Sequence, residues 1–125
     1  MNTFTFDKKE QKLLQIEINR KYFEINPYTL AVKTASEKFV NCQQPLIERI
    51  QKKPTGKELD SIITKACSLV RDTINQVLGK GAYDKIFAGR SMDFNEHQKV
   101  IEFLFHEIAE FCKQNPLIEK HESIA

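Results

Sequence analysis

The segment TGKELDSIITKACSLVRDTINQVL, residues 55–78, carries the clearest structural pattern in the chain. Its apolar residues recur at the spacing of one helical face, and polar or charged residues fill the other face. Thr55 and Glu58 form a capping box, in which a hydroxyl and a carboxylate each satisfy an otherwise unpaired backbone donor. The apolar arc covers about half of the circumference. The segment is therefore predicted to be a long helix packed against two neighbours.

The residues that follow, GKGAYDKIFAGR (79–90), hold three of the four glycines. A phosphate-binding loop would follow a strand and place Ser or Thr after its lysine, whereas this segment follows a helix. Asp84 also stands where a dinucleotide-binding motif has its third glycine. We interpret the glycines as helix ends: Gly79 closes the long helix in a left-handed conformation, and Gly89 ends a short helix at 83–87.

A last helix is predicted from Phe94 to about Lys113, opened by a box-like pair of Asp93 and Glu96. His97 lies on its apolar side, where we interpret it as a hydrogen-bonded core histidine and not as a ligand. Residues 115–125 are expected to be a frayed polar tail.

The N-terminal third begins with residues 1–12, which we interpret as a mobile arm or an edge strand. Leu14, Ile16 and Ile18 then alternate with polar residues, which is typical of a half-buried strand. A turn at 19–20 and an apolar run at 22–25 indicate a β-hairpin, although Asn-Arg is not the favoured turn pair.

A further helix is predicted to start at Asn26-Pro27, a side-chain cap followed by proline at the first helical position. Pro45 is expected to end or kink this helix, because proline removes a backbone hydrogen bond. Together these elements predict a mainly α protein: a short N-terminal β-hairpin followed by three main helices and one short helix, a small helix-dominated α+β fold. The domain is expected to span 13–114.

Composition narrows the classes of function. The 125 residues suit one domain, and the formal net charge of +2 gives no electrostatic case for nucleic acid. No apolar run approaches the roughly 18 residues that suggest a membrane span, and the N-terminus lacks the pattern of a secretory signal. Cys42, Cys67 and Cys112 are far apart in sequence and form no C-x-x-C pair. We therefore expect all three to be buried and to pack as small hydrophobic residues, which fits a reducing cytoplasm.

The stretch VLGKGAYDKIFAGRSMDFNEHQKVIEFLFHEI (77–108) resembles a segment of the tail assembly chaperones of long-tailed bacteriophages. In both, a helix ends in Leu-Gly, a short helix follows, and a long helix opens after a polar stretch. The residues that match are Leu78, Gly79, Ala82, Tyr83, Ile86, Phe87, Gly89, Arg90, Val100, Phe103 and Ile108. IEINRKYFEINP (16–27) is similar to the short hairpin that precedes the helices in that family.

The resemblance implies a protein that is not an enzyme and needs no cofactor. Such chaperones are thought to coat the tape-measure protein in the host cytoplasm until tail-tube subunits polymerise around it, and they are not expected in the mature virion. Family members often self-associate, so a homo-oligomer is expected, with no nucleic-acid or membrane partner. Many are also made in a longer, frameshifted form.

The candidate partner-binding residues are Phe103, Phe105, Tyr83 and Phe87. Phe103 falls on the far flank of the apolar stripe of its helix, where an exposed ring could anchor a partner. The alternative for Phe103 and Phe105 is a broader core that covers both rings. No metal site is expected, because His106 and His97 point to opposite sides of their helix.

The main alternative function is a small helical DNA-binding regulator, which would need basic residues gathered on one exposed helix face. Lys52, Lys53 and Lys57 do cluster, but in a predicted linker. An enzyme ranks third, because no motif links a nucleophile to a base.

Overall fold

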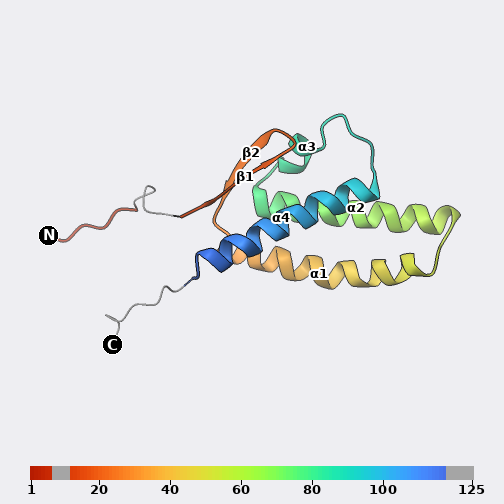
Figure 1. The fold of residues 1–125 in the computed structure, drawn as a ribbon, viewed down its shortest axis with the longest axis horizontal. Helices are drawn as coiled ribbons and strands as arrows, with labels where there is room; N and C mark the ends of the chain where they lie inside the picture. The colour runs from red at the N-terminus through yellow and green to blue at the C-terminus, as the bar shows by residue number, and fades with distance from the viewer. Residues whose placement is uncertain (7–11, 118–125) are drawn as a thin grey trace.

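The computed structural model describes residues 1–6 and 12–117. Within these residues the chain forms two strands and four helices, shown in Figure 1. In chain order they are β1 (Leu14–Ile18), β2 (Lys21–Ile25), α1 (Leu30–Gln51), α2 (Gly56–Leu78), α3 (Ala82–Ile86) and α4 (Phe94–Gln114). The predicted helix-dominated α+β fold with an N-terminal hairpin is confirmed.

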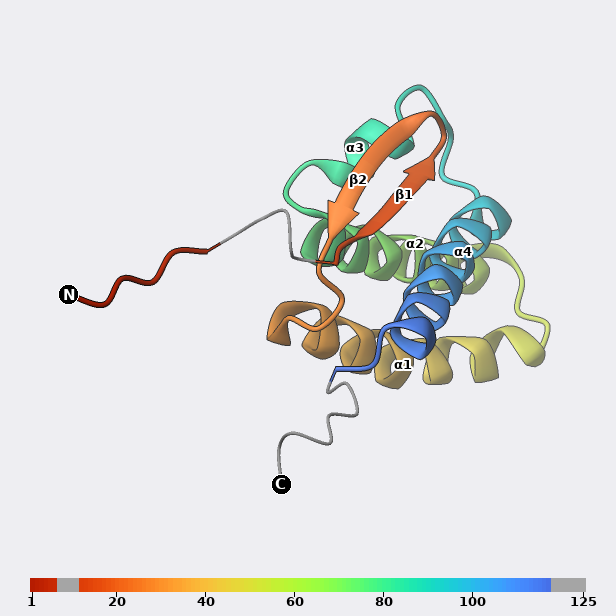
Figure 2. The ribbon, with the colours of Figure 1, turned by 60° about the vertical axis from the view of Figure 1, so that its left-hand side comes forward.

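The helices α1 and α2 form a long antiparallel pair, and the other elements pack at one end of it. α4 crosses this pair, and the β-hairpin lies with β1 beside α4 and β2 against α2 (Figure 2). The short α3 packs against α2 beneath the hairpin. The main core therefore sits at the hairpin end of the α1–α2 pair.

The core residues come from every element, which explains why the helices and the hairpin form one unit. The hairpin contributes the alternating isoleucines that the sequence pattern predicted, and α2 contributes a continuous stripe. The largest members with under 2% exposure in this cluster are Val70, Ile74, Ile86, Ile101 and Leu104.

The β-hairpin is joined by a two-residue turn with positive φ at both central residues, 50° at Asn19 and 64° at Arg20. This is the backbone of the hairpin turn that matches the twist of the flanking strands. The Asn19 side chain donates a hydrogen bond to the Ile86 carbonyl at 2.7 Å. The turn is thereby fastened to α3, which the sequence pattern did not indicate.

The start of α1 differs from the prediction. Asn26 accepts a hydrogen bond from the Tyr28 backbone N–H at 2.9 Å, so Asn26 and Pro27 form a turn ahead of the helix. The capping residue is Thr29, whose Oγ1 accepts from the Val32 N–H at 3.3 Å. The sequence placed the helix start three residues early, because an Asx turn and a helix cap use the same side chain.

Of the two outcomes predicted for Pro45, an end or a kink of α1, the end does not occur. α1 continues through Pro45 to Gln51, and Pro45 lies on its exposed side. An interior proline costs a helix about 3 kcal/mol. Here α1 packs along α2, and this packing offsets that cost.

The ends of α2 and α4 test the predicted caps. α2 begins at Gly56 as expected. The Thr55 side chain makes no capping hydrogen bond, and the contribution of this hydroxyl to the predicted capping box is therefore absent. Asp93 does cap α4, since its carboxylate accepts from the Glu96 N–H at 2.9 Å. Gly79 ends α2 with a φ of 112°, a conformation that favours glycine.

The N-terminal residues and the cysteines differ in part from the predictions. Residues 1–6 form no strand, residues 7–11 lie outside the described residues, and so do residues 118–125 of the expected tail. Cys67 is buried and Cys112 is half-buried, but Cys42 is exposed. The expectation of burial is therefore wrong for Cys42, which lies on the solvent side of α1.

Candidate interaction surface

Two of the four candidate aromatic residues, Tyr83 and Phe87, form an internal cluster with His97. The Phe87 ring stacks on the His97 ring with centroids 4.2 Å apart, and the Tyr83 ring stacks on Phe87 at 4.8 Å. Phe87 is 7% exposed and His97 is 1% exposed. The cluster joins α3 and the residue that follows it to the first turn of α4.

The hydrogen bonds of His97 define its tautomer. Its Nδ1 lies 2.7 Å from the Asp93 carbonyl oxygen, which can only accept, so Nδ1 carries the proton. Its Nε2 lies 2.6 Å from the Tyr83 hydroxyl, which donates its own proton to this nitrogen. His97 is thus a buried core histidine with a hydrogen-bond partner at both ring nitrogens, as the sequence interpretation had it.

Burial at this cluster favours the neutral forms of the Tyr83 hydroxyl and the Cys67 thiol. Burial raises the pKa of the Tyr83 hydroxyl. Burial, assisted by the nearby Asp93 carboxylate, also raises the pKa of the Cys67 thiol. A catalytic thiol needs a lowered pKa, so these groups serve packing better than nucleophilic chemistry.

The other two candidate aromatics lie on α4 and have different surroundings. Phe105 is half-buried and packs on Phe39 of α1, with ring centroids 5.3 Å apart, as in the broader-core alternative. Phe103 is 42% exposed. Of the four candidates, Phe103 therefore presents its ring to solvent, while Phe87 offers almost none of its surface to a partner.

Residues 1–6 and 12–117, which the structure describes, hold neither a metal-binding cluster nor a membrane-spanning helix. No group of three or more His, Cys, Asp or Glu side chains there is arranged to hold a metal ion. No helix in the same part of the chain is long and apolar enough to cross a membrane.

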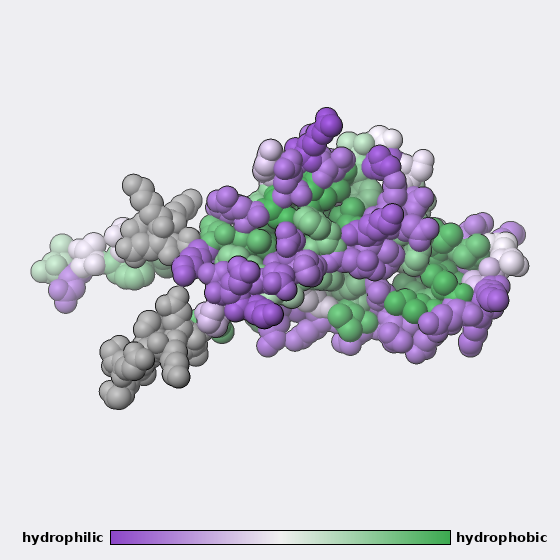
Figure 3. Space-filling model, in the orientation of Figure 1, coloured by the Kyte–Doolittle hydropathy of each residue, from purple (hydrophilic) through white to green (hydrophobic). Residues whose placement is uncertain are grey.

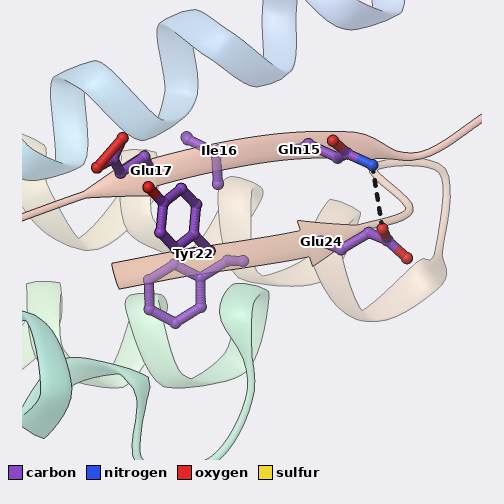
Figure 4. A pocket seen from close by; sticks show the side chains of 6 residues that line it. Gln15, Ile16, Glu17, Tyr22 and Glu24 are labelled. Carbon is purple, nitrogen blue, oxygen red and sulfur yellow. Dashed lines mark hydrogen bonds between the residues drawn. The ribbon is translucent and has the colours of Figure 1, made fainter. Parts of the chain in front are cut away.

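The outer face of the β-hairpin is polar and hollowed. A shallow depression of about 480 Å³ lies over it, bordered by Gln15, Glu17, Tyr22 and Glu24 (Figure 4). Gln15 donates to the Glu24 carboxylate at 3.3 Å, and the Tyr22 ring lies over β1 beside its cross-strand partner Glu17. Tyr22 is 79% exposed, so this face combines two carboxylates with an aromatic ring.

A second exposed feature is the far end of the α1–α2 pair. Asp93, just before α4, lies close enough to Cys67 to raise its pKa, and α2 extends eleven residues further to Gly56. Eleven helical residues span roughly 16 Å. Figure 1 shows α1 and α2 continuing past the start of α4 as a layer of two helices.

This end carries apolar side chains that are only half-buried, and Figure 3 shows apolar residues gathered there. We call it the distal surface and define it by Ile47, Ile50, Leu59 and Ile63. The sequence pattern assigned Leu59 and Ile63 to the apolar face of their helix. It could not show that α4 stops short of them, because helical periodicity does not reveal where a neighbouring helix ends.

A third feature is a pocket between the hairpin turn, α3 and α4, with a volume of about 250 Å³. Its walls include Ile18, Ile86, Phe87 and Val100, and its rim carries Arg90, Glu96 and Lys99. The Arg90 guanidinium donates two hydrogen bonds to the Glu96 carboxylate, one of them at 3.0 Å. This contact raises the pKa of Arg90 and lowers the pKa of Glu96.

The three lysines behind the DNA-binding alternative lie at the tip of the α1–α2 pair. Lys52 and Lys53 follow the end of α1, Lys57 is in the first turn of α2, and all three are exposed. They are therefore close to one another at one end of the molecule, although only Lys57 lies on a helix.

The fold and these surfaces define a small helix-dominated α+β protein with an N-terminal β-hairpin and exposed apolar surfaces on its helices. Residues 19–123 match the model of a family described as Family of unknown function (DUF6673), and the chain belongs to this family. Comparison with curated proteins gave no match, and comparison with solved structures gave none either.

Proposed function

We propose that the protein is a phage tail assembly chaperone that binds the tape-measure protein and keeps it soluble while the tail tube assembles. The order of elements supports this proposal, since a short hairpin precedes the helices and a short α3 lies between α2 and α4. That is the arrangement implied by the sequence resemblance. In this proposal the protein acts in the host cytoplasm and is not retained in the virion.

The observation that carries the proposal is the distal surface. Ile47 and Ile50 lie on the part of α1, and Leu59 and Ile63 on the part of α2, near the end of the pair that extends past the start of α4, and the four side chains are half-buried. A third helix packed there would continue the layer that α4 begins. Amphipathic helices bind apolar grooves in this way, with anchors three or four residues apart.

The chemistry of the distal surface fits an apolar helical client. Fully burying a leucine or isoleucine side chain contributes about 1.5–3 kcal/mol relative to leaving it exposed. The four side chains are half-buried already, so each would contribute a fraction of this on binding. Several weak apolar contacts suit a chaperone, because the client must be released when tail-tube subunits replace it.

The test is co-expression with a helical fragment of the tape-measure protein encoded near the same gene. The chaperone should keep the fragment in the supernatant after centrifugation, and Ile63→Lys should lose most of this effect. Thr64→Lys is the matched control, since Thr64 is an exposed neighbour on the same helix. A fragment that precipitates equally with the wild-type chain and without it contradicts the proposal.

The DNA-binding alternative rests on the exposed lysines at the tip of the α1–α2 pair. Binding of random duplex DNA by this tip would weaken steeply with salt, because phosphate contacts release counterions. Replacing Lys52, Lys53 and Lys57 together by Gln should then remove up to about three phosphate contacts. The plot of log affinity against log salt concentration should become less steep by about 0.9 for each lost contact. Filter binding or fluorescence anisotropy between 50 and 200 mM salt decides this, and absence of binding at low salt removes the alternative.

A further inference from the structure

Residues 1–6, MNTFTF, carry two aromatic rings exposed on a segment with no helix or strand. Phe4 is 78% exposed and Phe6 is 84% exposed. Their rings meet edge to face with centroids 5.0 Å apart. Figures 1 and 2 show these residues running away from the domain. Two phenylalanines in water are unfavourable for a chain that never covers them, since each ring has a large apolar area.

The spacing of the two rings restricts the surface that could cover them. In an extended segment, residues two apart project to the same side and lie about 6.6–6.8 Å apart along the chain. Phe4 and Phe6 are therefore a pair of anchors on one side of the segment, with Thr3 and Thr5 on the other. A surface that accepts them needs two apolar positions at a similar separation.

The pocket between the hairpin turn, α3 and α4 offers the first position. Its volume is about 250 Å³. The half-buried Val100 lies on its α4 side, and the almost fully buried Ile18, Ile86 and Phe87 form its floor. An apolar cavity of about 150 Å³ is large enough to hold benzene, so the pocket has room for one phenylalanine ring. Lys99 and Arg90 at its rim place cations where they can approach a ring face, a further attraction for an aromatic side chain.

Phe103 offers the second position. It lies four residues after Lys99 and three after Val100, so it follows the pocket along one side of α4. Helix positions three or four apart are about 5–6 Å from each other at Cβ, which is close to the separation of Phe4 and Phe6. The exposed Phe103 ring and the pocket together form an acceptor for two aromatic anchors.

We propose that residues 1–6 of one copy bind this acceptor on a second copy, with one ring in the pocket and the other against Phe103. The second copy is favoured over the same chain because residues 1–6 run away from the domain that carries them. Binding would cover three exposed aromatic rings, and reciprocal exchange between two copies would give a closed dimer. The distal surface takes no part in this contact.

The first experiment measures mass by sedimentation velocity over a range of concentrations. The wild-type chain should gain mass with concentration, and the double variant Phe4→Ser with Phe6→Ser should keep the mass of a single chain. Thr3→Ser with Thr5→Ser is the matched control and should behave as the wild type. A wild-type chain that stays single at high concentration, or a double variant that assembles normally, overturns the proposal.

The second experiment separates exchange between copies from binding within one chain. Phe103→Glu should lower self-association about as much as loss of both N-terminal rings, with unchanged helicity by circular dichroism. Mixing Phe103→Glu with the Phe4→Ser, Phe6→Ser variant should restore a 1:1 dimer, because one supplies the rings and the other the acceptor. A mixture that remains single-chain overturns exchange between copies. Binding of a tape-measure fragment by the ring-less variant is a separate readout, which reports on the distal surface alone.

Discussion

The Tyr83 hydroxyl donates to Nε2 of His97 across 2.6 Å, and this contact joins the short α3 to the first turn of α4. The two residues are fourteen positions apart, and the bend between them contains Gly89 and the Arg90–Glu96 ion pair. His97 is buried, so Tyr83 satisfies a nitrogen that would otherwise lack a partner. The bend is therefore held by a specific polar contact as well as by apolar packing.

Tyr83→Phe should destabilise the fold by about 1–3 kcal/mol, because it leaves a buried histidine nitrogen without a donor. Urea unfolding followed by circular dichroism measures the change. Tyr22→Phe is the matched control, since Tyr22 is largely exposed, and it should change the free energy of unfolding by less than about 0.5 kcal/mol. Equal stability of the Tyr83→Phe variant and the wild type would show that the hydrogen bond is not important.

Arg20→Gly should raise stability by about 0.5–1 kcal/mol. Arg20 has a φ of 64°, and a non-glycine residue there costs about 1–2 kcal/mol, partly offset by the greater freedom of glycine in the unfolded chain. The variant also creates the Asn-Gly pair that favours this turn. Thermal unfolding measures the gain, and Lys21→Gly, in the adjacent strand, should instead lower the melting temperature.

The cysteines should differ in their reaction with a thiol reagent. Cys42 is exposed, whereas burial and the Asp93 carboxylate raise the pKa of Cys67 and reduce its thiolate fraction. In chains that each retain one cysteine, Cys42 should react at least tenfold faster than Cys67 at neutral pH. In denaturant the two rates should converge. Fast labelling of Cys67 in the native chain would show that the α2–α4 contact opens readily.

The Arg90–Glu96 pair should contribute a pH-dependent stability. The hydrogen bond from Arg90 lowers the pKa of Glu96 below its unfolded value. The contribution is therefore present above the unfolded pKa and is lost as pH falls through the folded pKa, below about pH 4. Arg90→Ala should be slightly less stable than the wild type at pH 7, and the difference should shrink in acid. A difference that is constant down to pH 3 would show that Arg90 acts through packing.

The sequence predicted most elements because their patterns are local. The alternation of Ile16 and Ile18 and the stripe along residues 55–78 depend on the side that each residue faces, which backbone geometry sets. Asp93 was predicted as a cap because its partner, the Glu96 N–H, lies only three residues further along the chain. The helix end predicted as one outcome at Pro45 does not occur, because a local penalty of about 3 kcal/mol is outweighed by packing of α1 along α2, which no local pattern contains.

The candidate surface was harder to predict, because exposure depends on where distant elements end. Phe87 and Ile63 are both apolar residues at helical positions, yet the structure buries the first under His97 and leaves the second half-exposed. The partner of His97 could not be identified from spacing either, since Tyr83 approaches it across a bend. Exposure of Phe103 was one of two outcomes that the sequence left open, and it was suggested by the charged residues that flank this ring on its own helix.

Hydrogen exchange of the chain with and without a bound tape-measure fragment tests whether the uncovered end of the α1–α2 pair receives the client helix. We expect slower exchange in residues 44–51 and 56–66 on binding, with little change in residues 94–114. Slower exchange confined to α4, or no change anywhere in a complex shown to form, would contradict it.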